Sequence, residues 1–244
     1  MTSALPARAS RLRGARALFT GREGGVSTGE HAGLNLARHV GDEEHAVTRN
    51  RELLEAELGV PLVFVNQVHS AEVHALPPTG MAPVVTADAL VTDRRDVALA
   101  IMVADCLPVL LSDPVSGTIA AAHAGRAGLL GGVLQRTLEV MAEFGARPAD
   151  LTASIGPAIC GACYEVPAAM REEAAQQLPA TRASTSWGTP SLDLRAGAVA
   201  VLSAAGIPRD AIDTDHPCTL EEERFYSYRR QARTGRFAGV LRHV

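Results

Sequence analysis

Residues 97–125 read VALAIMVADCLPVLLSDPVSGTIAAAHAG, a stretch in which three apolar runs are separated by short polar segments. The length and aliphatic composition of these runs predict three strands, over 97–103, 108–112 and 118–122. Residues 113–117 carry the Asp, Pro and Gly of a turn between the last two runs. The stretch therefore predicts neighbouring strands, with Cys106 and His123 close to strand ends.

Outside this stretch, helix and strand patterns follow one another without a repeat. Apolar residues at three- and four-residue steps predict helices over 43–58, 129–144, 165–178 and 192–205. Shorter apolar runs predict strands over 17–20, 60–68, 72–76, 89–91, 151–155 and 237–241. Because these elements do not form repeated βαβ units, we expect an α+β fold with mixed β-sheets and helices in a single domain.

The composition is that of an ordinary globular protein. Of the 244 residues, 47% are hydrophobic and 20% charged, so the chain can bury a substantial core. A net charge of −4 without a basic tract argues against nucleic acid as the main partner. The apolar runs are too short to span a membrane. Residues 1–16 contain four arginines but no apolar segment of a secretory signal, so we expect a disordered lead-in before a domain over 17–244.

The four cysteines do not suggest a disulfide framework in a chain of this length. Without an export signal, we expect a cytoplasmic protein with reduced thiols. Cys160 and Cys163 form a C-x-x-C pair, a spacing found in redox sites and in metal knuckles. The sequence has no second such pair, and this one follows Gly156-Pro157 without the βαβ context of thioredoxin. A redox role is therefore disfavoured, and Cys160 has no explanation at this stage.

Three separated segments each place one metal-binding side chain beside a strand-like run: Gln67-Val68-His69-Ser70, Ala104-Asp105-Cys106-Leu107-Pro108 and Ala121-Ala122-His123-Ala124-Gly125. His69 and Cys106 are 37 residues apart, and Cys106 and His123 are 17 apart, so the spacing is not that of a local zinc knuckle. Two His and one Cys without a fourth ligand are typical of a catalytic zinc site with an open position. Taken singly, each residue is better explained as an ordinary core or surface side chain, and the spacing alone does not decide whether the three converge.

Two further segments carry reactive groups. In residues 155–166, a Gly-Pro turn precedes Tyr164 and Glu165, which favours acid–base chemistry or a substrate-binding loop. The alternative is a tight turn with Glu165 in the first turn of the following helix. In residues 225–236, Arg229 and its neighbours combine arginines, hydroxyls and glycine, a composition that favours phosphate binding. A solvated basic face is the alternative there, and the same two interpretations apply to Arg49 and Arg51.

Taken together, the motifs resemble the YfiH-like or laccase-domain family, described both as multicopper polyphenol oxidases and as purine nucleoside enzymes. They lie in the family's order over residues 17–244: Leu34-Asn35-Leu36, His39-Val40-Gly41-Asp42, Asn50-Arg51, Gln67-Val68-His69-Ser70, Ala87-Asp88-Ala89-Leu90-Val91-Thr92, Ala104-Asp105-Cys106-Leu107-Pro108, His123-Ala124-Gly125, Ile155-Gly156-Pro157, Cys163-Tyr164-Glu165-Val166, Ser227-Tyr228-Arg229-Arg230 and Thr234-Gly235-Arg236.

The resemblance implies a zinc ion held by His69, Cys106 and His123. It implies phosphorolysis of adenosine, inosine and 5′-methylthioadenosine, deamination of adenosine, and a fold of α/β/β/α layers. It also gives Arg51 the role of a phosphate-contacting arginine. The sequence departs from the family's pattern directly after the third ligand, where the family's binding pocket has its wall. The family commonly reads His-Ala-Gly-Trp-Arg-Gly, whereas this chain continues His123-Ala124-Gly125 with Arg126-Ala127-Gly128.

Both implied reactions are chemically reasonable at one zinc site. Zinc lowers the pKa of a bound water that can attack C6 of adenine. Phosphorolysis requires phosphate to be positioned against C1′ of the ribose while the departing base is stabilised. We expect Arg51 and Arg229 to bind phosphate and either Asp105 or Glu165 to carry protons. The expected partners are a purine nucleoside and phosphate, and the oligomeric state stays open between a monomer and a weak dimer.

Three alternatives use the same residues differently. A copper-dependent polyphenol oxidase would place Cu at the site with Met102 nearby. However, a multicopper cluster needs on the order of ten His, whereas the chain has eight and no His-x-His pair. A metal-free hydrolase would use Cys106 as a nucleophile activated by His123. A structural zinc site in a binding module would predict that chelation unfolds the chain.

Overall fold

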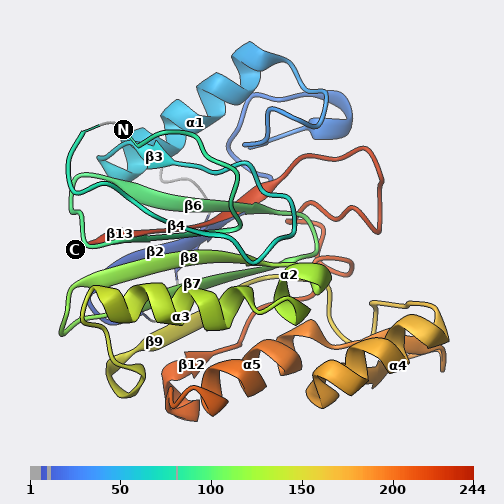
Figure 1. Cartoon of the computed structure of the whole chain (residues 1–244). Coiled ribbons are helices and arrows are strands. Elements are labelled where there is room, and N and C mark those ends of the chain that lie inside the picture. The colour runs from blue at the N-terminus through green and yellow to red at the C-terminus, as the bar shows by residue number, and fades with distance from the viewer. Residues whose placement is uncertain (1–6, 10–11, 81) are drawn as a thin grey trace.

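The computed structural model describes residues 7–9, 12–80 and 82–244, and two stacked mixed β-sheets form its centre (Figure 1). In spatial order, the first sheet contains β1 (Ala7–Ala9), β2 (Ala15–Thr20), β13 (Phe237–His243), β6 (Ala98–Val103) and β3 (Leu62–Val63). The second contains β12 (Ile212–Asp213), β9 (Thr152–Ile155), β7 (Leu107–Asp113), β8 (Thr118–Ala124), β5 (Ala89–Thr92) and β4 (Val73–Ala75). Most neighbours are antiparallel, but β3–β6, β4–β5 and β9–β12 are parallel.

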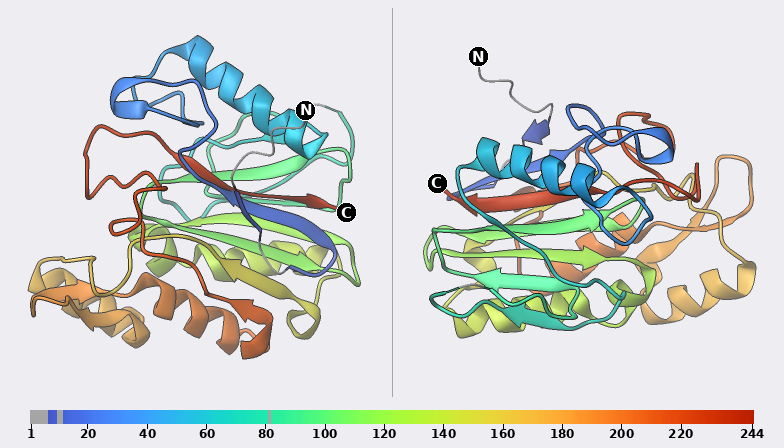
Figure 2. Two further views of the ribbon diagram at one scale, coloured as in Figure 1. Left: turned by 180° about the vertical axis from the view of Figure 1, so that it is seen from behind. Right: turned by 90° about the horizontal axis from the view of Figure 1, so that it is seen from above.

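Helices cover the outer faces of both sheets. They are α1 (Glu44–Leu58), α2 (Arg126–Leu130), α3 (Val133–Glu143) and α5 (Leu194–Ala204). The helix α4 (Ala168–Gln177) instead packs on a small hairpin of β10 (Arg182–Ser184) and β11 (Pro190–Leu192). Figures 1 and 2 show α1 over the first sheet, with α2, α3 and α5 on the far side of the second. The predicted α+β fold and its α/β/β/α layers are therefore confirmed.

The strands at the centre are apolar on both faces because each face meets another layer. In β7, Leu107, Val109 and Leu111 pack toward the helices, whereas Leu110 points into the core between the sheets. The same period of two runs through β6, β8 and β13. Each fully buried leucine contributes about 1.5–3 kcal/mol through the removal of its apolar surface from water. This alternation explains why residues 97–125 are aliphatic almost throughout.

Two helices differ from the predicted ranges: one is divided in two, and the other begins later. The helix expected over 129–144 is split into α2 and α3 at Gly131 and Gly132, and Gly132 has a left-handed φ of 90°. The helix expected from residue 165 begins only at Ala168, after Pro167 in extended conformation. Glu165 forms an isolated bridge with Ser191 instead of lying in the first helical turn.

The strand expected over 60–68 is also shorter than predicted. Only Leu62–Val63 forms β3, and the chain beyond it is irregular apart from an isolated bridge between Asn66 and Thr86. Within the lead-in expected to be disordered, β1 forms and pairs with β2, which itself begins at Ala15. Residues 1–6, 10 and 11 of that segment lie outside the described residues.

Among the residues that the structure describes, none of the helices combines the length and apolar character needed to cross a membrane.

Candidate active site

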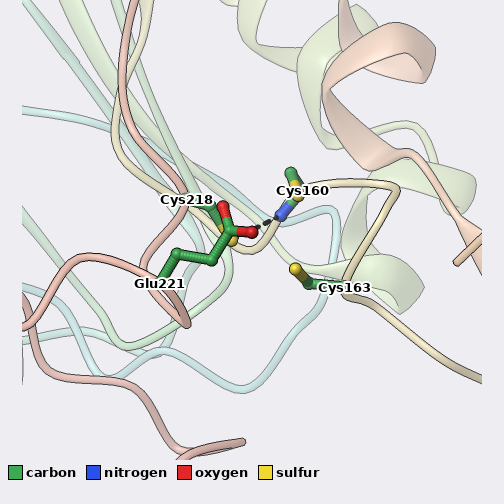
Figure 3. A group of neighbouring side chains, drawn as sticks. All are labelled: Cys160, Cys163, Cys218 and Glu221. Carbon is green, nitrogen blue, oxygen red and sulfur yellow. Dashed lines mark hydrogen bonds between the residues drawn. The ribbon is translucent and has the colours of Figure 1, made fainter. Parts of the chain in front are cut away.

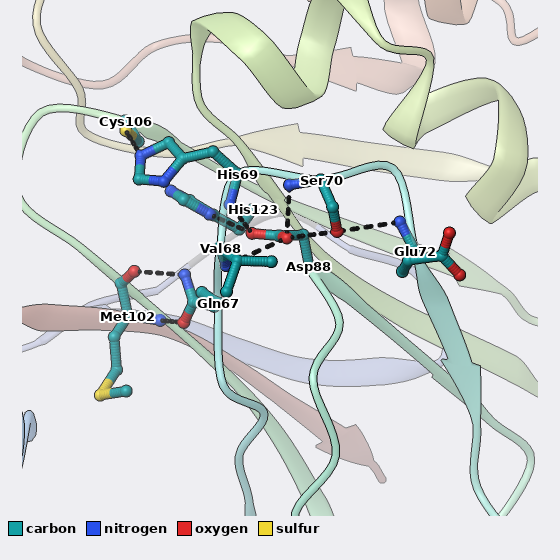
Figure 4. A network of polar contacts seen from close by, with 9 residues as sticks. All are labelled: Gln67, Val68, His69, Ser70, Glu72, Asp88, Met102, Cys106 and His123. Atoms are coloured by element: carbon teal, nitrogen blue, oxygen red, sulfur yellow. Dashed lines mark hydrogen bonds and ion pairs between the residues drawn. The ribbon is translucent and has the colours of Figure 1, made fainter.

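The three predicted metal ligands meet at one end of the sheet stack. His69 comes from the irregular segment between β3 and β4, Cys106 directly precedes β7, and His123 lies on β8. Their potential ligand atoms all lie within 4.8 Å of one another, and Cys106 Sγ is 3.6 Å from His69 Nε2 (Figure 4). The β7–β8 register places Pro108 opposite His123, which brings Cys106 beside that histidine. The geometry therefore joins residues that are far apart in the sequence.

Two of the supporting backbone positions are unusual. His69 has a φ of 62° and Asp105 a φ of 94°, the positive-φ residues other than glycine in the described chain. Non-glycine residues rarely occupy this region, and such strain is concentrated at functional sites. The Gln67 side chain fixes the first segment, because its amide donates to Met102 O at 2.8 Å and accepts from Met102 N at 2.9 Å. The His69 segment is thus held against β6.

Asp88 orders the His69 segment and His123 together. Its Oδ1 accepts hydrogen bonds from His69 N at 2.9 Å and from His123 Nδ1 at 2.8 Å. Its Oδ2 accepts from Ser70 N at 2.6 Å, Ser70 Oγ at 2.7 Å and Val68 N at 3.2 Å (Figure 4). Because a carboxylate only accepts, His123 carries its proton on Nδ1 and keeps Nε2 as a metal donor, the carboxylate–histidine arrangement of zinc proteins.

Sequence reasoning gave Asp88 no role, although it lies in one of the quoted motifs. The available signal was a carboxylate directly before the apolar run Ala89–Thr92, since a charge at a buried strand end requires partners. Asp88 is fully buried. Although burial raises its pKa, the hydrogen bonds from His123 and Ser70 outweigh that effect and hold the pKa below its usual range. The site therefore keeps a permanent negative charge behind His123.

Charge at the ligands themselves suits a cation. Burial favours the neutral thiol of Cys106, but hydrogen bonds from His123 and His69 lower its pKa to about 6. Burial likewise lowers the pKa of His123, whereas Asp88 and Cys106 raise it to about 9, so without a metal His123 is protonated at neutral pH and would release its Nε2 proton when zinc binds. A thiolate beside two imidazoles, with no fourth protein donor grouped with them in the described chain, matches the donor set of zinc with an open coordination position.

Gly125 allows the ligands to approach one another. A Cβ atom at this position would lie 2.6 Å from His69 Cδ2 and 3.0 Å from Cys106 Sγ. Any larger residue would therefore push the His69 ring or the thiol away from the metal position. The glycine of the His-Ala-Gly motif is explained by this close approach.

A cavity of about 410 Å³ opens beside the ligands, a volume within the range of small-molecule sites. Its wall includes three arginines, Arg126, Arg229 and Arg236, and two tyrosines, Tyr164 and Tyr228. Arg126 is the residue that departs from the family's pattern, and it borders the cavity directly. The cavity thus combines metal donors, cationic groups and aromatic rings.

Of the other predicted site residues, Asp105 and Arg229 line this cavity, whereas Glu165 does not. Asp105 lines it, with Oδ1 accepting from Thr219 Oγ1 at 2.7 Å and Oδ2 from Arg229 N at 2.7 Å. Arg229 also lines it and donates from Nη1 to Glu165 O at 2.8 Å. The Glu165 carboxylate accepts from Trp187 Nε1 at 2.9 Å, and Glu165 is not among the cavity-lining residues.

Arg51 lies behind the cavity wall. Its Nε and Nη2 donate to Leu36 O at 2.9 and 2.7 Å, and its guanidinium lies over the Phe64 ring at 3.9 Å. Its Nη2 is 3.9 Å from Sδ of Met102, which does line the cavity. Burial, together with the nearby charge of Arg38, lowers the pKa of Arg51 to about 10, so the side chain stays charged at neutral pH.

The sequence profile of the family described as "Multi-copper polyphenol oxidoreductase laccase" matches residues 16–243. This chain belongs to that family. Purine nucleoside phosphorylase SCO2081 of Streptomyces coelicolor is 50% identical over 234 residues, which span 94% of this chain and 96% of the relative. Among solved structures, YlmD of Geobacillus stearothermophilus is 32% identical with a TM-score of 0.88, covering 95% of this chain and 92% of that one.

Another solved structure, that of the hypothetical protein YfiH of Bacillus licheniformis, is 29% identical with a TM-score of 0.85 and covers 94% of this chain and 93% of its own. The resemblance inferred from the motifs is therefore confirmed, and so is the fold of mixed sheets and helices. The description of the family and the names of its members point to different chemistry, copper oxidation in one case and phosphorolysis in the other.

Proposed function

We propose that this chain is a zinc-dependent purine nucleoside phosphorylase that cleaves adenosine, inosine and 5′-methylthioadenosine with phosphate and also deaminates adenosine. One observation carries the proposal: a single cavity is bordered both by the donors His69, Cys106 and His123 and by three arginines. A nucleoside needs an apolar or aromatic wall, and its phosphate co-substrate needs cations. The phosphorylase names of the relatives support the same reaction class.

In this proposal, the residues of the chain position the two substrates. Arg229 binds phosphate at the cavity edge, where its backbone N–H is held by Asp105, its Nη1 by Glu165 O, and its guanidinium lies 5.2 Å from the Tyr164 ring centre. Arg51 is the second proposed phosphate ligand, next to the cavity behind Met102. When bound, zinc would act as a Lewis acid that activates a water for deamination.

Proton transfer to the departing base is assigned to Asp105 or Glu165. Asp105 lines the cavity, whereas the Glu165 carboxylate is held by Trp187 outside it. We therefore place Asp105 first as the proton carrier. Its carboxylate would have to exchange the hydrogen bond from Thr219 or from Arg229 for one to the substrate.

A product assay tests the function. Zinc-replete protein incubated with adenosine and phosphate is expected to release adenine and ribose 1-phosphate, with inosine as the deamination product. Cys106→Ala should abolish both reactions together with the zinc held at His69, Cys106 and His123. If zinc-replete protein gives no nucleoside product with either adenosine or inosine, the proposal is wrong.

A metal-free hydrolase is a second candidate, favoured by a specific geometry. Cys106, His123 and Asp88 form a thiol–imidazole–carboxylate chain, and the lowered pKa of Cys106 suits a nucleophile. Metal analysis separates the two candidates. Loss of the zinc at the His69 group in Cys106→Ala supports coordination, whereas an enzyme that is active without metal at this group supports nucleophilic catalysis.

The copper oxidase implied by the family description is supported less well. Within the described chain, which includes all eight histidines, two groups of three or more candidate ligands are found, and only the His69 group contains histidine. A multicopper centre needs several histidine-rich positions. An intense blue colour after addition of copper would favour the oxidase.

We further propose that the protein works in the cytoplasm on a purine nucleoside and phosphate. All four cysteines are free thiols, and each lies in one of the two ligand groups. Thiols arranged in this way keep their ligand function in a reducing compartment. Labelling of the native protein with a thiol reagent directly after lysis should find no disulfide.

A further inference from the structure

A second group of candidate ligands shares no residue with the His69 site. Cys160 and Cys163 lie in the turn that follows β9, and Cys218 and Glu221 lie in the segment after β12 (Figure 3). One potential ligand atom from each residue lies within 4.8 Å of all the others. Cys163 and Cys218 are buried, Cys160 is half-buried and Glu221 is exposed. Three sulfurs and one carboxylate thus converge from two segments that are nearly 60 residues apart.

The local backbone is shaped to support thiolates. Both Cys163 N and Tyr164 N donate to Cys160 O, at 3.0 and 2.9 Å, which closes the C-x-x-C turn around the first cysteine. The N–H of Cys160 donates to Cys218 Sγ at 3.4 Å, and the N–H of Ala162 is directed at the Cys160 thiol. Backbone N–H groups directed at sulfur stabilise the thiolate form.

Without a cation, these thiols oppose one another. Three sulfurs and a carboxylate oxygen lie within 4.8 Å of one another, so their negatively charged forms would repel one another. A bound divalent cation removes this conflict, because the thiols then ionise and release their protons to solvent. The carboxylate of Glu221 adds a fourth anionic donor.

A half-buried arginine lies close enough to offset part of that charge. Arg195 interacts electrostatically with Cys160 and Cys218, and its buried Nε has no hydrogen-bond partner among the described residues. Its other nitrogens are fixed by His216 O and Gly156 O. One Zn²⁺ with three thiolates and one carboxylate would carry a net charge of −2, and Arg195 would compensate for one unit of it.

We propose that Cys160, Cys163, Cys218 and Glu221 form a second, structural zinc site. Four protein donors close the coordination sphere, as in structural zinc sites, whereas the His69 group supplies three donors and leaves a position open. A disulfide would use only two of the three sulfurs and would leave the carboxylate without a role. The C-x-x-C pair of the sequence is thereby explained as half of a metal site.

A zinc ion at this second site would hold two residues of the cavity wall, Tyr164 and Asp105, in place. Cys163 directly precedes Tyr164, which lines the cavity, and Ile159 N donates to Asp105 O at 3.0 Å. On the other segment, Thr219 follows Cys218 and donates to the Asp105 carboxylate. Joining the two segments through a metal would therefore hold Tyr164 and Asp105 at the cavity without touching the substrate.

Metal content tests this proposal independently of any activity. After chelation and reloading with Zn²⁺, the full wild-type chain is expected to hold two zinc ions, and Cys106→Ala is expected to retain one. The X-ray absorption of zinc in Cys106→Ala should then show sulfur ligands at about 2.3 Å together with one oxygen. The Cys106→Ala protein keeps every ligand of the second site, so the test does not depend on the folding of a cysteine-cluster variant.

Glu221 offers a matched pair of variants. Glu221→Gln, made in the Cys106→Ala background, should weaken zinc binding at least tenfold, whereas Glu223→Gln, an exposed neighbour outside the group, should leave it unchanged. A wild-type chain that holds a single zinc ion, with none in Cys106→Ala, would overturn the proposal. A Cys160–Cys163 disulfide in the reloaded protein would overturn it as well.

Discussion

Replacing Asp88 with asparagine tests whether the buried carboxylate positions the metal ligands. The asparagine keeps the size of the side chain but can accept with one oxygen only. Oδ1 and Oδ2 each face at least two donors, so the amide group would face at least two N–H or O–H groups that lose their acceptor. Each buried donor left without a partner costs about 1–3 kcal/mol, so we expect a loss of about 2–6 kcal/mol in the unfolding free energy of the metal-free protein.

The same substitution should weaken zinc binding at His69, Cys106 and His123. Loss of a carboxylate partner behind a histidine ligand typically lowers metal affinity by about 10–100-fold, which corresponds to about 1.4–2.7 kcal/mol. Competition with a chromophoric chelator measures the affinity. Asp113→Asn is the matched control, because Asp113 is also buried and accepts from two backbone N–H groups, but at the opposite end of β7. Equal zinc affinities in Asp88→Asn and Asp113→Asn would refute the reasoning.

Four further predictions concern Asp88 and residues near the cavity. Gly125→Ala should reduce zinc affinity at least tenfold while the secondary structure seen by circular dichroism is retained, since its Cβ would lie 2.6 Å from the His69 ring; an unchanged affinity would contradict this. In steady-state kinetics, Arg229→Gln should raise the KM for phosphate about tenfold or more. Arg51→Lys should raise this KM in the same way if Arg51 contacts phosphate. If the role of Arg51 is limited to its contacts with Leu36 and Phe64, Arg51→Lys should lower only the melting temperature. Finally, because the pKa of Asp88 is depressed, its stabilising effect is present above its unfolded pKa of about 3.9 and is lost as the pH falls further. Chemical denaturation of the metal-free wild type and Asp88→Asn should therefore show a stability difference that shrinks between about pH 5 and pH 3. A constant difference would argue against an ionised Asp88.

The sequence predicted those parts of the fold that depend on local patterns. Residues 97–125 have unbroken aliphatic runs because both faces of β6, β7 and β8 are covered, and such runs are visible without a structure. The missed helix boundaries depend on single residues. Gly132 splits one helix through its left-handed φ, and Pro167 delays another, while the apolar periodicity continues through both positions.

The site was less accessible to sequence reasoning because it depends on contacts between distant segments. Taken singly, His69, Cys106 and His123 favoured ordinary roles, and only the family motifs joined them. Asp88 and Arg236 act through partners that no local pattern reveals: the β5–β8 pairing brings Asp88 to His123, and the last segment before β13 brings Arg236 to the cavity. Glu165 shows the opposite case: its motif predicted a role in the site, but in the structure its carboxylate binds Trp187 outside the cavity.

The position of Cys106 follows from how the chain passes between the sheets. The strand β6 belongs to the first sheet and β7 to the second, and only Ala104, Asp105 and Cys106 separate them. So short a crossing requires a sharp turn, which the left-handed Asp105 provides. An insertion of one residue into this crossing would disturb either the site or the core. Either Cys106 would move away from His123, or the register of β7 would shift by one residue, so that the side chains on its two buried faces would exchange places. The core packing of β7 and the geometry of the metal site are therefore fixed by the same three residues.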